Sequence, residues 1–214
     1  MKRFIALFLI FALAVPIFYS CTKEEKEPPR ENLVITEDEA RETLALLIEG
    51  AYEINEIFFG EGLPYDGEPN GESAATAQYL PVSDESPYLS IKEIKIAAEK
   101  IYSDGYLESV YGTAFEGITI DSSEAEGGYA GYPLSPRYKM FNEELRVNAK
   151  HVGFKLNTVP LAETAIVVAE ACTPDYVTVQ LNYTRRDDAS YSGTMRLQLS
   201  QNAEGQWRLD SPTY

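Results

Sequence analysis

Within residues 175–185, DYVTVQLNYTR, apolar and polar side chains alternate from Val177 to Thr184. The apolar set is Val177, Val179, Leu181 and Tyr183, and the polar set is Thr178, Gln180, Asn182 and Thr184. Successive side chains of a strand point to opposite faces of a sheet, so this pattern is typical of an antiparallel strand with one face in water. We therefore predict a strand here, with its apolar side facing a core.

The segments around this strand extend the pattern into a sheet. Downstream, GTMRLQLSQ (193–201) alternates in the same way, and residues 206–209 form a last short strand after an NAEG turn. Upstream, ETAIVVAEAC (163–172) is almost wholly apolar, which predicts a strand buried on both faces. Residues 136–149, PRYKMFNEELRVNA, predict a hairpin that turns at 142–144. Together these segments predict a meander of about five or six antiparallel strands.

Helical patterns come earlier in the chain. Residues 36–60 place apolar side chains at helical spacing, and Thr36 begins a capping box at their start. Ser90 repeats that spacing before a second helix, and residues 103–112 predict a third, short one. Helices that precede an antiparallel sheet indicate the α+β class, with the helices packed on the apolar face of the sheet. We expect one such domain over residues 36–214.

The beginning of the chain predicts export and a lipid anchor. A basic start and an apolar run of about 15 residues indicate a secretory signal over residues 1–20. Ser20 directly before Cys21 resembles the lipobox of bacterial lipoproteins, which implies that Cys21 is acylated and anchors the chain outside the cell at a bacterial membrane. Residues 21–35 would then be a charged tether. The alternative is a disulfide between Cys21 and Cys172, the only other cysteine.

Charge limits the classes of partner. The chain has 18 basic and 34 acidic residues, a formal charge of −16. Removal of residues 1–20 would take away two basic residues and leave −18. This charge excludes nucleic acid as a partner and disfavours docking on anionic lipid head groups beyond the tether. It is compatible with a cationic partner, and it also keeps a surface protein in solution.

Catalytic and metal chemistry have weak support. His151, the only histidine, and Cys172 are the one candidate thiol and base pair, but Cys172 ends an apolar segment where a cysteine is usually a core residue. One histidine and one available cysteine are too few for a typical zinc site, and no carboxylate pair stands out among 34 acidic residues. We therefore predict no enzyme activity and no cofactor.

A calcium loop is the nearest metal motif. Asp66, Glu68, Asn70 and Gly71 match the first, third, fifth and sixth positions of such a loop. Ala77 occupies the twelfth position, where a glutamate is expected, so we interpret this stretch as an ordinary loop without metal.

The segment DSSEAEGGYAGYPLSPR (121–137) is first acidic and then aromatic. One interpretation is a solvated surface loop without a binding role; the other is a binding loop, because exposed tyrosines add contact area at little entropic cost. We name Glu124, Glu126, Tyr129 and Tyr132 as candidate partner-binding residues.

Three stretches together suggest a family: SIKEIKIAAEKIYSDGYLESVY (90–111), the hairpin at 136–149, and GQWRLDSPTY (205–214). They resemble the IseA-like family of secreted inhibitors of cell-wall D,L-endopeptidases. The resemblance implies a non-enzymatic protein that covers the substrate cleft of papain-like peptidoglycan hydrolases. The lipid tether departs from freely secreted members.

A second resemblance leaves an alternative open. Helices followed by a meander that ends in a strand with Trp207 are similar to the nuclear-transport-factor-two-like cone. That fold hosts many activities, so it would imply a ligand-binding or sensory module with an unknown ligand. Such a module would use Thr178, Gln180 and Asn182, or the loop from Tyr129 to Tyr132, to line its pocket.

Overall fold

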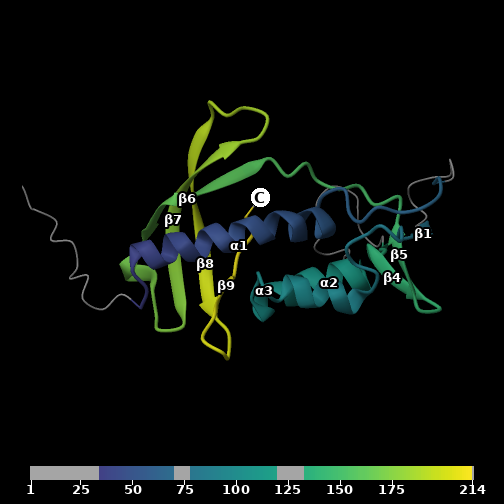
Figure 1. Cartoon of the computed structure of the whole chain (residues 1–214), viewed down its shortest axis with the longest axis horizontal. Helices are drawn as coiled ribbons and strands as arrows, with labels where there is room; N and C mark the ends of the chain where they lie inside the picture. Colours follow the sequence, from purple (N-terminus) through teal and green to yellow (C-terminus); the bar gives the residue numbers. More distant parts are fainter. Residues whose placement is uncertain (1–33, 70–77, 120–132, 214) are drawn as a thin grey trace, which may run out of the picture. The chain divides into compact units, whose positions relative to one another are not determined.

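A computed structural model describes residues 34–69, 78–119 and 133–213, and these belong to one unit that spans Asn32–Tyr214. Figure 1 labels its elements. The helices are α1 (Glu37–Phe58), α2 (Ile91–Ala98) and α3 (Asp104–Tyr111), with a π-helical turn η2 (Gly112–Glu116) and a 3-10 turn η3 (Ala169–Ala171). The strands are β1 (Tyr79–Pro81), β2 (Ile118–Thr119), β3 (Pro133–Leu134), β4 (Tyr138–Phe141), β5 (Glu144–Asn148), β6 (Thr158–Val167), β7 (Tyr176–Arg185), β8 (Ser192–Gln201) and β9 (Trp207–Leu209).

Helix α1 begins at the predicted capping box. The Glu39 backbone N–H donates to Thr36 Oγ1 at 3.2 Å, and the Thr36 N–H donates back to Glu39 Oε2 at 2.9 Å. These hydrogen bonds from Thr36 lower the pKa of Glu39. The first turn is acidic, which suits the positive end of the helix dipole. The sequence therefore predicted the start of this helix correctly.

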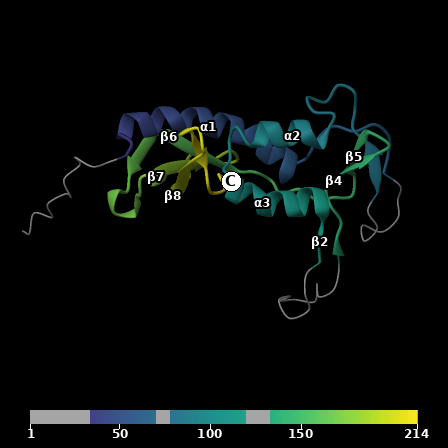
Figure 2. The ribbon, with the colours of Figure 1, turned by 90° about the horizontal axis from the view of Figure 1, so that it is seen from below.

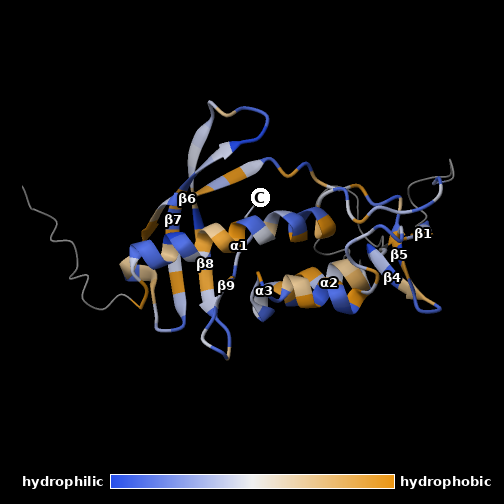
Figure 3. Ribbon diagram, viewed as in Figure 1, coloured by the Kyte–Doolittle hydropathy of each residue, from blue (hydrophilic) through white to orange (hydrophobic). Residues whose placement is uncertain are grey.

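The C-terminal sheet is an antiparallel meander in the order β6-β7-β8-β9. Its apolar side chains are buried in the same core as the apolar face of α1, and Figure 2 shows α1 lying over β6, β7 and β8. Figure 3 shows apolar and polar residues alternating along α1 and β8. The residues of β7 and β8 in this core include Val177, Val179, Leu181, Leu197 and Leu199. The α+β class, with helix packed on a C-terminal meander, is confirmed.

The predicted hairpin at 136–149 belongs to a different sheet. Strands β4 and β5 pair as expected, and the turn residues Asn142 and Glu143 have φ of 49° and 68°, as a tight hairpin turn requires. They form a three-stranded sheet in the order β1-β5-β4, so the meander itself has four strands. The sequence does not predict the short strand β1.

The apolar segment 163–172 differs from its prediction. Strand β6 starts earlier, at Thr158, and ends at Val167, after which η3 turns the chain toward β7. Among the residues that the structure describes, it is an edge strand that pairs only with β7, and the pairing shifts register between Leu161 and Ile166. Ile166 is consequently 45% exposed, so this strand is not buried on both faces.

The C-terminal residues form hydrogen bonds with the helical part of the chain. The backbone N–H of Leu209 donates to the Ile101 carbonyl at 2.8 Å, and Ser103 N–H donates to the Leu209 carbonyl at 2.8 Å. Beyond them, Thr213 is buried and reaches α1, where Asn55 Nδ2 donates to its hydroxyl at 2.8 Å. The last strand and the tail therefore join the sheet to α1 and to the segment between α2 and α3.

Candidate functional site

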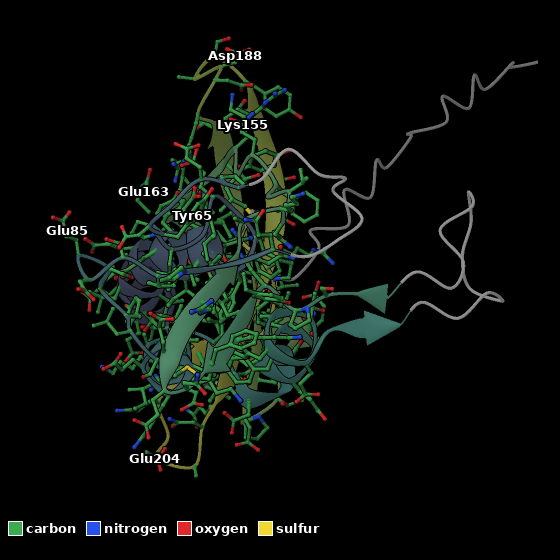
Figure 4. All side chains as sticks on the ribbon, turned by 90° about the vertical axis from the view of Figure 1, so that its right-hand side faces the viewer. Tyr65, Glu85, Lys155, Glu163, Asp188 and Glu204 are labelled. Carbon is green, nitrogen blue, oxygen red and sulfur yellow. The ribbon has the colours of Figure 1, made fainter. Side chains whose placement is uncertain are left out.

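The four predicted partner-binding residues Glu124, Glu126, Tyr129 and Tyr132 lie outside the described residues, as does Cys21. The structure does describe both ends of the segment that carries the four. Strands β2 and β3 pair antiparallel and place Ile118 opposite Leu134 and Thr119 opposite Pro133. Figures 2 and 4 show this two-stranded ribbon pointing away from the helices. The candidate loop is thus attached at the end of a projecting ribbon.

An aromatic cluster holds the first strand of the ribbon at its base. Residue Phe115 of η2 packs against Phe58, Tyr111 and Tyr138, with ring centroids 5.9, 5.5 and 6.3 Å away. Gly117 then turns the chain into β2 with φ of 81°, and its N–H donates to the Gly112 carbonyl at 2.8 Å. A positive φ of this size favours glycine, so the direction in which the chain leaves η2 depends on Gly117.

Two buried polar side chains hold the second strand. Arg137, 2% exposed, donates from Nη1 to the Phe58 carbonyl at 3.2 Å and from Nη2 to the Gly60 carbonyl at 2.7 Å. Tyr138 donates to the Ile57 carbonyl at 2.8 Å, and burial raises its pKa. The last carbonyls of a helix lack intrahelical donors, and a cation is favoured at this negative end of the dipole. The ribbon is therefore fastened to the end of α1.

We call Phe115, Arg137 and Tyr138 the ribbon base. Both Nη atoms of Arg137 and the Tyr138 hydroxyl donate to backbone carbonyls, and the rings pack against α1, so the ribbon base supports the loop and offers no reactive group. Nothing in the sequence pattern singles out Arg137, because its carbonyl partners lie 77 and 79 residues away. The sequence shows only the proline-containing stretch before Arg137 and the predicted end of the first helix, and neither indicates that the two meet.

The structure separates the candidate thiol and base. The Arg41 side chain, near the start of α1, donates to the carbonyl of Ala165 at 3.0 Å, close to where β6 leads to Cys172. At the other end of α1, Phe154, three residues after His151, donates its N–H to the Phe59 carbonyl. The helix rises about 27 Å between those two contacts. His151 and Cys172 therefore do not form a dyad.

Each of these two residues has a structural setting of its own. The Cys172 thiol is free and donates to the Val168 carbonyl, with the two atoms 3.2 Å apart. Its alternative disulfide partner, Cys21, is outside the described residues. Burial, together with the charge of Arg137, lowers the pKa of His151.

A cavity of about 520 Å³ opens between the start of α3 and the β8–β9 turn. Its acidic lining residues are Glu99, Asp104, Glu204 and Asp210, so it favours cations over anions. The Ser103 hydroxyl donates to Asp210, and Arg208 donates to the Glu99 carbonyl at 2.9 Å. These lining groups hold α3 and the β8–β9 turn in place.

The polar residues of β7 do not line this cavity. Thr178 is buried and its hydroxyl donates to the Ala171 carbonyl at 3.3 Å, whereas Asn182 is exposed. Thr178, Gln180 and Asn182 are all absent from the cavity lining. The residues expected for a cone-shaped binding module therefore do not meet at this cavity.

Metal ligands do not gather within the described residues, where no group of three or more His, Cys, Asp or Glu could hold an ion. Of the calcium-like stretch, Asp66 and Glu68 are described and Asn70 and Gly71 are not. Asp66 donates its N–H to the Pro81 carbonyl at 2.9 Å, which ties this stretch to β1.

Comparison with known proteins adds no relative: no family model matches the chain, and no curated protein matches it significantly. None of the helices in the described part of the chain is long and apolar enough to cross a membrane.

Proposed function

We propose that this chain is a lipid-anchored, extracytoplasmic protein that binds peptidoglycan D,L-endopeptidases and inhibits them by covering their substrate cleft. It performs no reaction itself. Cys21 carries the anchor, residues 1–20 are removed, and residues 21–35 form the tether. The observation that best supports this proposal is the projecting β2–β3 ribbon, whose base is fixed to α1 and which carries the acidic and aromatic segment 120–132.

The ribbon suits inhibition for a physical reason. A loop that must enter an enzyme cleft loses less entropy on binding when both of its ends are already held. The hydrogen bonds of Arg137 and Tyr138 hold one end, and the packing of Phe115 holds the other. Glu124 and Glu126 would face cationic groups of the enzyme, while Tyr129 and Tyr132 would supply contact area.

The test is inhibition of peptidoglycan digestion by the chain 22–214 with the loop altered. Glu124→Gln with Glu126→Gln, and separately Tyr129→Ser with Tyr132→Ser, should each weaken inhibition at least tenfold. The matched control is Glu42→Gln with Glu49→Gln, which removes the same charge from exposed positions of α1 and should change inhibition less than twofold.

Two results would contradict the proposal. One is that no purified D,L-endopeptidase forms a complex with the chain at micromolar concentration. The other is that the loop variants and the α1 control lose inhibition equally, because the inhibition would then depend on the total negative charge of the chain and not on the loop.

The alternative function is a ligand-binding or sensory module, and the cavity of about 520 Å³ is the observation that favours it. Pockets of this size accept small molecules, although most are lined by apolar side chains. A cationic ligand that protects the chain from thermal unfolding, with loss of protection in Asp104→Asn, would support this alternative over inhibition.

A further inference from the structure

Residues 149–157, which we call the strap, join β5 to β6 and cross the end of α1. The Phe154 N–H donates to the Phe59 carbonyl at 2.6 Å, and Gly153 lies so close that an added Cβ would overlap the Gly60 carbonyl oxygen. Gly153 of the strap therefore packs directly against the backbone at the end of α1. Its neighbours project outward: Val152 is 81% exposed and Phe154 is 68% exposed.

The strap is also the basic part of an acidic protein. Residues 145–162 contain no Asp or Glu, although the chain has 34, and they include Arg146, Lys150 and Lys155. The end of β7 adds two cations beside the strap, because Arg186 donates its N–H to the Asn157 carbonyl at 2.9 Å.

Carboxylates border the strap at two places: Asp187 and Asp188 are in the β7–β8 turn, and the Glu56 carboxylate lies beside Gly60 at the end of α1. Asp187 forms an ion pair with Arg185, with 2.9 Å between Nη2 and Oδ2. The pKa of Asp187 is lowered, first by the hydrogen bond from Asn157 and also by Arg185 and Lys155. Figure 4 shows Lys155 on the same side of the molecule as the turn that carries Asp188. The strap itself contains Lys150 and Lys155 and no carboxylate, so its exposed apolar side chains lie between two lysines in the sequence.

We propose that the strap docks on the anionic surface of the membrane that holds the lipid anchor. Val152 and Phe154 enter the head-group region, and Lys155 with the neighbouring cations faces lipid phosphates. This inference rests on the anchoring part of the proposed function. A soluble polyanion would engage the cations but would leave the two apolar side chains in water, so a bilayer fits the surface better.

The net charge of the chain does not prevent this contact. At physiological ionic strength, electrostatic interactions between exposed charges are screened over about 8 Å, so distant carboxylates act only weakly on the strap and its two lysines. The expectation from total charge, that anionic lipids are disfavoured, is tested by the vesicle experiment below. An anchored chain also has a high effective concentration at the membrane, so weak docking suffices.

The tether is long enough for the anchor and the strap to share one plane. About 13 residues separate Cys21 from Val34, and they span up to about 45 Å when extended. Helix α1, whose far end the strap crosses, has 22 residues and a length of about 33 Å. The acyl chains can therefore insert beside the strap even when α1 lies along the membrane.

The experiment measures how deeply the strap enters a bilayer. The chain 21–214 with Cys172→Ala keeps one thiol, and Cys21 is coupled to a maleimide phospholipid in vesicles. Trp207→Phe removes the only tryptophan, and Phe154→Trp places a new one on the strap. Leu46→Trp is the matched control, because Leu46 is 72% exposed on α1, away from the strap.

Brominated acyl chains should quench the Phe154→Trp variant at least about threefold more than the Leu46→Trp control on vesicles with anionic lipid. Lys155→Glu should reduce that quenching, and neutral vesicles should give less of it. Val152→Trp is a second reporter should Phe154→Trp fold poorly by circular dichroism.

Equal quenching of the strap and α1 variants would overturn the inference. So would a strap fluorescence that responds to a purified endopeptidase and is unchanged by lipid, since the strap would then be a protein contact. Because the anchor is attached chemically, these outcomes do not depend on acylation in the cell or on inhibition of any hydrolase.

Discussion

At the scale of single residues, a few buried polar side chains connect distant parts of the chain. Tyr102 donates to Asn55 Oδ1 at 2.7 Å, and Asn55 donates to Thr213 at 2.8 Å. All three side chains are almost fully buried. Buried polar groups that lose their partner cost more than exposed ones, so this chain of hydrogen bonds fixes where the C-terminus docks.

Thr213→Val keeps the size of the side chain but leaves the buried Asn55 amide without its acceptor. We expect a loss of about 1–3 kcal/mol in the free energy of unfolding, measured by urea denaturation. Thr194→Val makes the same change at an exposed position of β8 and should stay within about 0.5 kcal/mol of the wild type. Equal effects of the two substitutions would show that the Asn55 contact does not hold the tail.

His151 predicts a pH dependence. Its pKa in the folded chain lies below its ordinary value of 6.5, because burial and Arg137 disfavour the charged ring. The unfolded chain therefore binds more protons near pH 6. The contribution of neutral His151 to the free energy of unfolding is fully present above about pH 6.5 and is lost as the pH drops toward the lowered pKa.

His151→Gln removes this contribution, so its unfolding free energy should decline less than that of the wild type between pH 7.5 and 5.5. Urea denaturation of both chains across this range checks the difference. Since the chain has one histidine, parallel pH profiles would contradict the assigned pKa direction.

Residue roles were predictable from the sequence where the partner is close in the chain. Thr36 and Ser90 cap helices as their spacing predicts, and Ser103 caps the third helix; each side chain accepts from the N–H three residues later. Arg137 was missed, because a lone arginine in a loop gives no sign that it will be buried against the end of a distant helix.

At the scale of elements, the strap and the ribbon both depend on close contact with the end of α1. Gly153→Ala would bring a Cβ to 2.6 Å from the Gly60 carbonyl carbon, and a backbone atom cannot move aside cheaply. We expect the strap to lift and the free energy of unfolding to fall by about 1–3 kcal/mol, measured by urea denaturation.

The control for this prediction is Gly112→Ala. Gly112 has φ of −53° and ψ of −48°, and an added Cβ would meet nothing within 4 Å. Alanine there should raise stability by about 0.4–1 kcal/mol, because it restricts the unfolded chain. If the Gly153→Ala chain were as stable as the Gly112→Ala chain, the position of the strap would not depend on the close contact between Gly153 and Gly60.

Elements with a regular pattern were predicted from the sequence, and irregular ones were not. The alternation in β7 and the capping box of α1 are strong local signals, and both elements form where expected. The prediction that segment 163–172 is buried on both faces was wrong, because an apolar run does not distinguish a central strand from an edge strand that bends at a register shift. Strand β1 has three residues, and its pairing with β5 depends on contacts 65 residues or more apart in the chain.

The candidate site was predictable only in part. The acidic and aromatic composition of residues 120–132 marks a loop, and the structure adds that β2 and β3 join its ends. Its fixed base was not predictable, because the base is assembled from α1, η2 and the residues after β3. The strap was not predicted either, since the exposure of Phe154 follows from the tight packing of Gly153.

At the scale of the whole molecule, charge is distributed unevenly. The chain is strongly acidic, yet residues 145–162 carry only basic charges. In our account, the acidic loop faces a cationic enzyme and the basic strap faces the membrane. Electrostatic attraction of this kind raises the rate of association more than the affinity, so salt should slow the encounter with the enzyme.

The most direct test of the central claim is the steady-state kinetics of a purified D,L-endopeptidase on a soluble muropeptide, with increasing concentrations of the chain 22–214. A protein that covers the substrate cleft competes with substrate, so we predict that the apparent KM rises in proportion to the added chain while kcat stays constant. An unchanged KM at micromolar chain, or a product that appears with the chain alone, would contradict the account.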